Sequence, residues 1–70
     1  MPYYRCYILG GNNSIVAVED NSHADDQAAT EWAQKIFDER PGCTGVELWQ
    51  GARLVHRKLR PLDPGGGRNP

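Results

Sequence analysis

The residues of this 70-residue chain that could bind a metal ion are two cysteines and two histidines: Cys6, His23, Cys43 and His56. Zinc sites usually contain closely spaced pairs of such ligands, whereas consecutive members of this set are 13 to 20 positions apart. Cys6 lies in an apolar segment and is explained as a core residue, and His23 beside a helix cap is explained as a solvated side chain. The sequence therefore predicts no metal site and no cofactor.

Glu47 and His56 form the one acid–imidazole pair that a hairpin would place on neighbouring strands. A carboxylate that orients an imidazole is part of many nucleophilic sites, but no serine or cysteine is placed beside this pair. The glycines at 10–11 and at 65–67 do not lead into a helix, as a phosphate-binding loop requires. We expect that the chain is not an enzyme, and we interpret the pair as a cross-strand polar contact.

Large apolar and aromatic residues are the strongest candidates for a function, because the predicted strands place them on one face of a sheet. They are Tyr3, Tyr7, Leu9, Ile15, Trp49 and Leu54, with Arg5 and Arg53 at the rim. A small monomer rarely exposes so contiguous an apolar patch without using it, and aromatic residues and arginine dominate the energetics of buried interfaces. We predict that this face binds a second copy of the chain, or makes it an accessory subunit of another protein, through six residues: Tyr3, Arg5, Tyr7, Trp49, Arg53 and Leu54.

The same face supports an alternative function, the binding of single-stranded nucleic acid. Aromatic side chains on an open sheet stack on bases, and five basic residues are available for phosphates: Arg5, Arg53, Arg57, Lys58 and Arg60. The net charge of −1 argues against this alternative, as does the first part of the chain, where residues 1–43 hold seven acidic and three basic side chains. We therefore expect a protein partner rather than nucleic acid.

Four strands and one helix must position these residues. Segments 3–9, 14–20, 46–50 and 53–59 are rich in aromatic and β-branched residues and are predicted to be strands. The cluster of glycine and asparagine at 10–13 predicts a turn that tolerates positive φ angles. Gly51 and Ala52 suit a two-residue type II′ turn, in which glycine comes first.

The segment from residue 24 to about residue 40 is predicted to be the helix. Its apolar residues recur at helical spacing: Ala28, Ala29, Trp32, Ala33, Ile36 and Phe37. Ser22 is the expected N-cap, with Asp25 at the capping-box position. Pro41 ends the helix.

The first hairpin decides which side chains share a face, since a slip of one residue inverts a strand. A loop of three or five residues gives three cross-strand pairs: Arg5 with Glu19, Tyr7 with Ala17, and Leu9 with Ile15. It also places four apolar residues on the side of the helix: Cys6, Ile8, Val16 and Val18. A loop of even length would set Arg5 against Val18, so we predict the odd loop, which yields one ion pair and one compact apolar patch.

The second hairpin follows from its two-residue turn. The predicted pairs are Trp49 with Leu54, Leu48 with Val55, and Glu47 with His56. Val46, Leu48 and Val55 then face the helix, whereas the other side chains of these pairs point away from it: Glu47, Trp49, Leu54 and His56.

The order ββαββ predicts an α+β fold, with antiparallel hairpins and one helix packed on one face of the sheet. Residues 1–60 are expected to form a single domain, and the Pro- and Gly-rich residues 61–70 a disordered tail. The first residues lack the basic and apolar regions of a secretory signal, and no segment has the apolar length of a membrane span. We expect a cytoplasmic protein with reduced cysteines.

Four segments between residues 3 and 58 carry a resemblance to other proteins: Tyr4-Arg5-Cys6-Tyr7-Ile8, Ile15-Val16-Ala17, Asp25-Asp26-x-Ala28-Ala29, and Val46-Glu47-x-Trp49-x-Gly51-Ala52-Arg53. In these segments the chain resembles a group of short, uncharacterised bacterial proteins, mostly from soil and plant-associated α-proteobacteria. The resemblance implies the ββαββ architecture and a cytoplasmic setting. It implies no activity.

Overall fold

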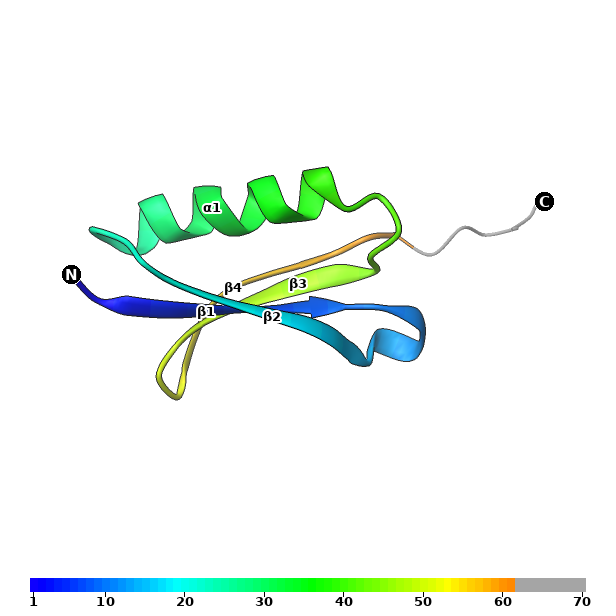
Figure 1. Cartoon of the computed structure of the whole chain (residues 1–70), viewed down its shortest axis with the longest axis horizontal. Helices are drawn as coiled ribbons and strands as arrows, with labels where there is room; N and C mark the ends of the chain where they lie inside the picture. The colour runs from blue at the N-terminus through cyan, green and yellow to red at the C-terminus, as the bar shows by residue number, and fades with distance from the viewer. Residues whose placement is uncertain (62–70) are drawn as a thin grey trace.

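The computed structural model describes residues 1–61 and confirms the α+β fold with the element order ββαββ (Figure 1). Strands β1 (Tyr3–Leu9) and β2 (Ile15–Ser22) form the first hairpin around a short 3₁₀ turn, η1 (Gly11–Asn13). Helix α1 (Asp26–Glu39) leads to the second hairpin, β3 (Gly45–Gln50) and β4 (Arg53–Leu59). No helix among the described residues has the length and apolar content that a membrane span requires. Apart from Pro61, the predicted tail lies outside the described residues.

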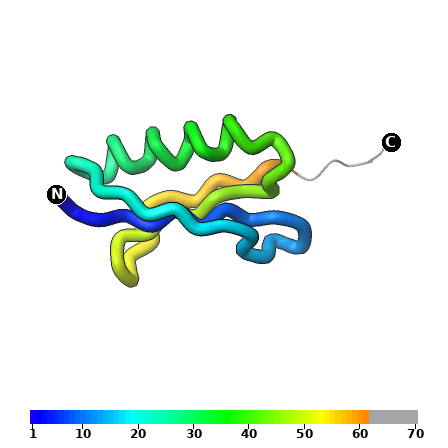
Figure 2. Tube along the Cα trace, viewed as in Figure 1, coloured from blue at the N-terminus to red at the C-terminus, as the bar shows by residue number. Residues whose placement is uncertain are grey.

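The four strands form one antiparallel sheet in the order β2-β1-β3-β4. The central strands are therefore β1 and β3, and the two edges are β2 and β4. Since β2 and β3 both run antiparallel to β1, they are parallel to each other, and the connection between them crosses the sheet through α1. Figures 1 and 2 show α1 lying along one face of the sheet, as predicted.

The core lies between α1 and the two central strands. The sheet contributes the inward side chains of β1 and β3, each at most 2% exposed: Tyr4, Cys6, Ile8, Val46 and Leu48. The helix contributes Ala29, Ala33, Ile36 and Phe37, which lie on one side of it because they follow its period. The predicted apolar spacing of the helix is thus confirmed.

The helix begins after Asp25, and Ser22 is not its N-cap, which corrects the prediction. The side chain of Asp25 accepts a hydrogen bond of 2.8 Å from the backbone N–H of Ala28, so one of the free N–H groups of the first turn is satisfied. Ser22 pairs with Tyr3 as the last residue of β2, and this pairing holds it in the sheet.

The other end of the helix is held by Arg60. Its guanidinium donates hydrogen bonds to the backbone oxygens of Cys43 (2.9 Å), Arg40 (3.3 Å) and Phe37 (3.4 Å). It also lies over the ring of Phe37, 4.2 Å from the ring centroid. Arg60 therefore adds hydrogen bonds to carbonyl groups at the end of the helix and in the loop that follows it, two of which (Phe37 and Arg40) also accept a backbone N–H.

A β-bulge changes the register of the first hairpin. Leu9 pairs with Ile15 as predicted, but the next pair is Ile8 with Ala17, so Val16 is an extra residue on β2. Beyond the bulge, two predicted pairs are wrong: Tyr7 faces Val18 instead of Ala17, and Arg5 faces Asp20 instead of Glu19.

The bulge also corrects the predicted apolar patch on the helix side. Cys6 and Ile8 are buried there, as expected. Val18 instead lies opposite Tyr7 on the other face and is 47% exposed, and Val16 is 62% exposed. Ala17 lies opposite Ile8, in the place that the prediction gave to Val16, and packs against the core.

A second bulge lies in the second hairpin. Trp49 pairs with Leu54 as predicted, but Leu48 pairs with His56, so Val55 is the extra residue of β4. Two further predicted pairs are therefore wrong: Leu48 does not face Val55, and Glu47 faces Arg57 instead of His56. His56 shares the helix side with Leu48, and Val55 still packs against the core as expected.

The two turns have the backbone that their residues predict. Gly51 has a φ of +58°, and the residue after it has a negative φ, which is the pattern of a type II′ turn. In the first turn Asn12 and Asn13 have φ angles of 62° and 57°. Asparagine tolerates this left-handed region better than most residues, so the turn forms without a glycine at either position.

Candidate functional site on the open sheet face

The sheet face opposite α1, called the open face below, is built by side chains from all four strands. Strand pairing arranges most of them in three rows: Leu59, Gly45, Leu9 and Ile15; Arg57, Glu47, Tyr7 and Val18; Leu54, Trp49, Arg5 and Asp20. Tyr3 lies beyond the third row on β1, opposite Ser22. No helix or strand of residues 1–61 covers these rows (Figure 1).

Several large apolar side chains of the open face are accessible to solvent, but Leu9, which was predicted to be exposed there, is only 3% exposed. The exposed fractions are 67% for Tyr3, 56% for Ile15, 47% for Val18, 45% for Leu54 and 42% for Leu59. Tyr7 and Trp49, which lie between these exposed residues in the sheet, are half-buried. A surface with this many large apolar groups across neighbouring strands is typical of an interaction site.

The charged groups of the open face are paired with one another. Arg5 Nε lies 2.8 Å from Asp20 Oδ1, and this hydrogen bond raises the pKa of the Arg5 guanidinium above its ordinary value. Arg57 Nε lies 3.3 Å from Glu47 Oε2, and the indole N–H of Trp49 donates to Glu47 Oε1 at 3.2 Å. Each of these carboxylates therefore has a partner in its own chain, which lowers the cost of removing water from this face.

Five of the six predicted binding residues lie together on the open face: Tyr3, Arg5, Tyr7, Trp49 and Leu54. Several of them border a hollow of about 220 Å³ that also reaches Asp20. Arg53 is not among them, because its side chain lies on the helix side and contacts Asp26. The structure adds apolar residues that the wrong register hid, above all Val18 and Leu59.

Arg53 belongs to a cluster at the start of α1. Its two terminal nitrogens donate to Asp26 Oδ1 and Oδ2 at 3.0 and 3.1 Å, and it also contacts the side-chain oxygen of Gln50. The hydroxyl of Tyr4 donates to Asp26 Oδ1 at 2.7 Å. These bonds from Arg53 and Tyr4 lower the pKa of Asp26, and the bond to Asp26 raises the pKa of Tyr4. Through these hydrogen bonds the cluster links the start of the helix to the residues that flank the turn between β3 and β4.

The five basic residues considered for phosphate binding all have contacts within the chain. Arg5, Arg53 and Arg57 form the ion pairs described above, and Arg60 binds the end of the helix. Lys58 Nζ lies 5.8 Å from the centroid of the Phe37 ring, on the helix side. The five therefore do not form one basic surface beside the aromatic residues.

The cysteines and histidines are dispersed over the fold. Cys6 is fully buried, and burial raises the pKa of its thiol to about 11, which is the behaviour of an inert core cysteine. Cys43 is also buried, and both thiols are free. In residues 1–61, no group of three or more histidine, cysteine or acidic side chains is arranged to hold a metal ion. Glu47 and His56 lie on opposite faces, so the predicted acid–imidazole pair does not form.

The comparisons with known proteins identify no relative. No protein-family model matches the chain, and searches of curated proteins and of solved structures found no match. The function must therefore be argued from the geometry alone.

Proposed function

We propose that the protein is a small protein-interaction domain that forms a homodimer through its open face. One observation carries the proposal: five apolar side chains, 42 to 67% exposed, lie on one sheet face whose charged residues are already paired. Burial of this face would remove apolar surface from water and would leave no charge of these rows without a partner. A domain within a chain of only 70 residues also gains from such burial, because its own core is small.

A second copy of the chain is the simplest partner for this face. In a two-fold symmetric dimer the open face lies on both sides of the interface, so the exposed apolar side chains of one copy can meet those of the other copy. We also propose that the chain is related to the short α-proteobacterial proteins that it resembles, and that it has the cytoplasmic setting which this resemblance implies. It is compatible with an accessory subunit and assigns no activity.

We favour a protein partner over single-stranded nucleic acid. The aromatic residues of the open face could stack on bases, but Arg5 and Arg57 beside them are neutralised by Asp20 and Glu47. Because the remaining basic side chains contact the helix side, phosphates would meet no free positive charge in the three rows.

The proposal is tested by the solution mass of the purified protein, measured by light scattering over a range of concentrations. We expect twice the monomer mass for the wild type. Trp49→Ala and Leu54→Lys should each raise the dimer dissociation constant at least about tenfold, because both remove apolar contacts from the open face. Val16→Lys is the matched control, since Val16 is 62% exposed and lies near the far end of the helix.

A wild-type monomer at the highest concentration would refute the homodimer. So would a dimer that is weakened by Val16→Lys as much as by Leu54→Lys. Binding of a single-stranded oligonucleotide that is lost in the double variant Arg57→Glu/Lys58→Glu would instead support the nucleic-acid alternative.

A further inference from the structure

Two ion pairs lie on the face that the dimer is proposed to bury. In the described residues the titratable groups of the open face are four charged side chains and two phenols: Arg5, Asp20, Glu47, Arg57, Tyr3 and Tyr7. Helix α1 lies on the opposite face, so the sheet separates its charges from these pairs (Figure 1). Below neutral pH only the two carboxylates of this set change their charge, because phenols and guanidinium groups keep their protons.

Glu47 is the carboxylate on a central strand of the sheet. It belongs to β3, faces Tyr7 of β1, and has a side chain that is only 23% exposed. Arg57 Nε lies 3.3 Å from Oε2, and the indole of Trp49 donates to Oε1 at 3.2 Å, so each carboxylate oxygen has one partner. The negative charge of Glu47 is therefore held between half-buried aromatic side chains and a single guanidinium.

Asp20 is the corresponding carboxylate on an edge strand. It belongs to β2, and the side chains of Asp20 and its partner Arg5 are 39% and 54% exposed. Its Oδ1 atom lies 2.8 Å from Arg5 Nε. Because an edge position is more accessible to water than a central one, loss of the Asp20 charge should matter less to an interface on this face than loss of the Glu47 charge.

Burial of the open face changes the contribution of both pairs. In the monomer they are partly exposed, so water solvates the guanidinium when its carboxylate takes up a proton. A dimer removes this water, and a guanidinium cannot lose its own proton. Protonation of the carboxylate then leaves a buried positive charge without a partner, which costs far more than breaking an exposed pair. The dimer therefore favours the charged form of the carboxylates more strongly than the monomer does.

We propose that the dimer through the open face is acid-sensitive: proton uptake by Glu47, and to a smaller extent by Asp20, dissociates the two copies. This inference rests on the homodimer proposed above and assigns its regulation. Proton uptake and dissociation are linked, so association is strongest at neutral pH and weakens as pH falls toward 4, where carboxyl groups take up protons. Each dimer contains every pair twice, so the effect of one site on the dissociation constant is squared.

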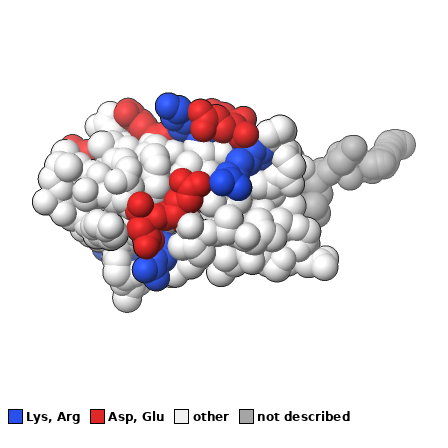
Figure 3. Space-filling model, viewed as in Figure 1, with Lys and Arg blue, Asp and Glu red and all other residues white. Residues whose placement is uncertain are grey.

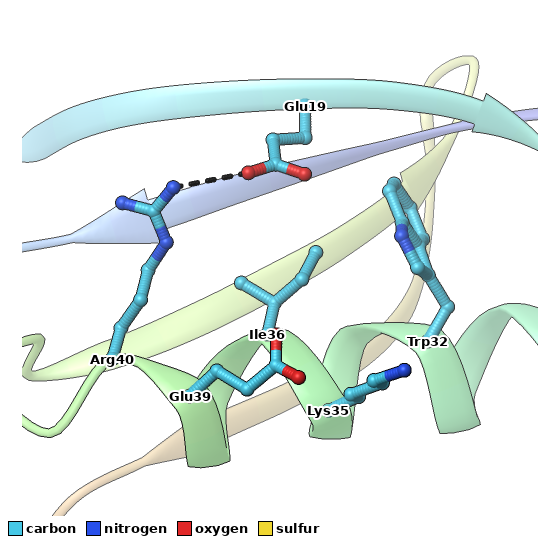
Figure 4. Close-up of a pocket in the computed structure, with 6 residues that line it drawn as sticks. All are labelled: Glu19, Trp32, Lys35, Ile36, Glu39 and Arg40. Carbon is cyan, nitrogen blue, oxygen red and sulfur yellow. Dashed lines mark hydrogen bonds and ion pairs between the residues drawn. The ribbon is translucent and has the colours of Figure 1, made fainter.

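The side of the molecule that carries α1 and β2 supplies a matched control. Figure 3 shows acidic and basic side chains lying next to one another on this side. One such pair is Glu19 and Arg40, whose Oε2 and Nη2 atoms are 3.0 Å apart in a groove between α1 and β2 (Figure 4). The two side chains are about as exposed as those of Arg5 and Asp20. A dimer through the open face leaves this pair in water, so its loss should not affect association.

The first experiment measures the dimer dissociation constant by light scattering at pH 7, 6, 5 and 4, with far-UV circular dichroism as a check of the fold at each pH. We expect the constant to rise at least about fivefold between pH 7 and pH 4. An unchanged constant with the fold intact would overturn acid sensitivity and leave the homodimer standing. A wild-type monomer at pH 7 would instead refute the homodimer on which the inference rests.

The second experiment removes the charges at pH 7 and therefore needs no acid. Glu47→Gln keeps the shape of the side chain and an oxygen that can accept from Trp49. We expect it to raise the dissociation constant at least about tenfold, Asp20→Asn to raise it less, and Glu19→Gln to leave it unchanged. The constant of Glu47→Gln should also depend less on pH than that of the wild type. A Glu47→Gln dimer as tight as the wild type, or a Glu19→Gln dimer as weak as Glu47→Gln, would overturn the inference.

Discussion

At the scale of single residues, most of the charged side chains near the sheet act in pairs that fasten one element to another. Arg5 and Asp20 join β1 to β2, Arg40 and Glu19 join the end of the helix to β2, and Arg53 joins β4 to Asp26 of the helix. Exposed ion pairs of this kind each contribute little to the free energy of unfolding. The pair of Arg53 with Asp26 differs because Tyr4 also donates to the same carboxylate from a nearly buried position.

Asp26→Asn should therefore lower the melting temperature at pH 7 by about 3 to 6 °C, measured by circular dichroism. The pKa of Asp26 is lowered in the folded protein, so its stabilisation is present above its ordinary pKa and is lost as pH falls through the folded value. The difference between wild type and Asp26→Asn should accordingly shrink below about pH 4. The control is Glu31→Gln, which removes the same charge from an exposed position of the helix and should change the melting temperature little. If Glu31→Gln lowered the melting temperature as much as Asp26→Asn, the cluster of Asp26, Arg53 and Tyr4 would not contribute specifically to stability.

At the scale of elements, the sequence predicts the helix and the two hairpins, because apolar residues at a regular spacing or characteristic turn residues mark each of them. Apolar residues at helical spacing located α1, and the turn residues located both hairpins. The pairs nearest the turns, Leu9 with Ile15 and Trp49 with Leu54, were predicted correctly because few residues separate them from the turn.

The sequence does not reveal the two bulges, and the errors in register follow from them. Residues 15–18 are all apolar, so no alternation shows that Val16 is the extra residue, and Leu54 and Val55 pose the same problem in β4. Which of these neighbouring apolar residues is left unpaired decides the register beyond it, which is why the face of Val18 and the partner of Arg5 were predicted wrongly. Arg53 was expected at the rim of the open face, and its contact with Asp26 depends on how the helix lies over the sheet.

Strand β4 passes very close to the backbone of its neighbour β3 at Gly45. A Cβ atom there would lie 2.6 Å from Leu59 Cδ2 and 2.6 Å from the backbone oxygen of Lys58. Because the backbone atom cannot move without displacing β4, Gly45→Ala should lower the free energy of unfolding by about 1 to 3 kcal/mol. Gly42→Ala is the control, since a Cβ at Gly42 meets nothing within 4 Å. Urea denaturation of both variants measures the difference, and similar midpoints would disprove the close approach.

At the scale of the whole molecule, the sheet has one face covered by α1 and one face that is open (Figure 1). The groove between α1 and β2 lies on the covered side and is lined by acidic and basic side chains in equal number: Glu19 and Glu39 with Lys35 and Arg40. The open face instead carries exposed apolar side chains, and its ion pairs are internal. A dimer through the open face would therefore bring apolar surfaces together and leave the groove of each copy accessible.

A homodimer through the open face also predicts that thermal stability depends on protein concentration, because association stabilises the folded state by mass action. The melting temperature of the wild type should rise by about 4 °C or more over a roughly hundredfold increase in concentration. Leu54→Lys should remove this dependence, since it places a charge among the exposed apolar side chains of the open face. Val16→Lys should retain it, because Val16 borders the space beside Ile8, Gly10 and Arg40 and not the open face. A wild-type melting temperature that is constant across the range, or a slope that survives in Leu54→Lys, would mean that the open face does not hold two copies together.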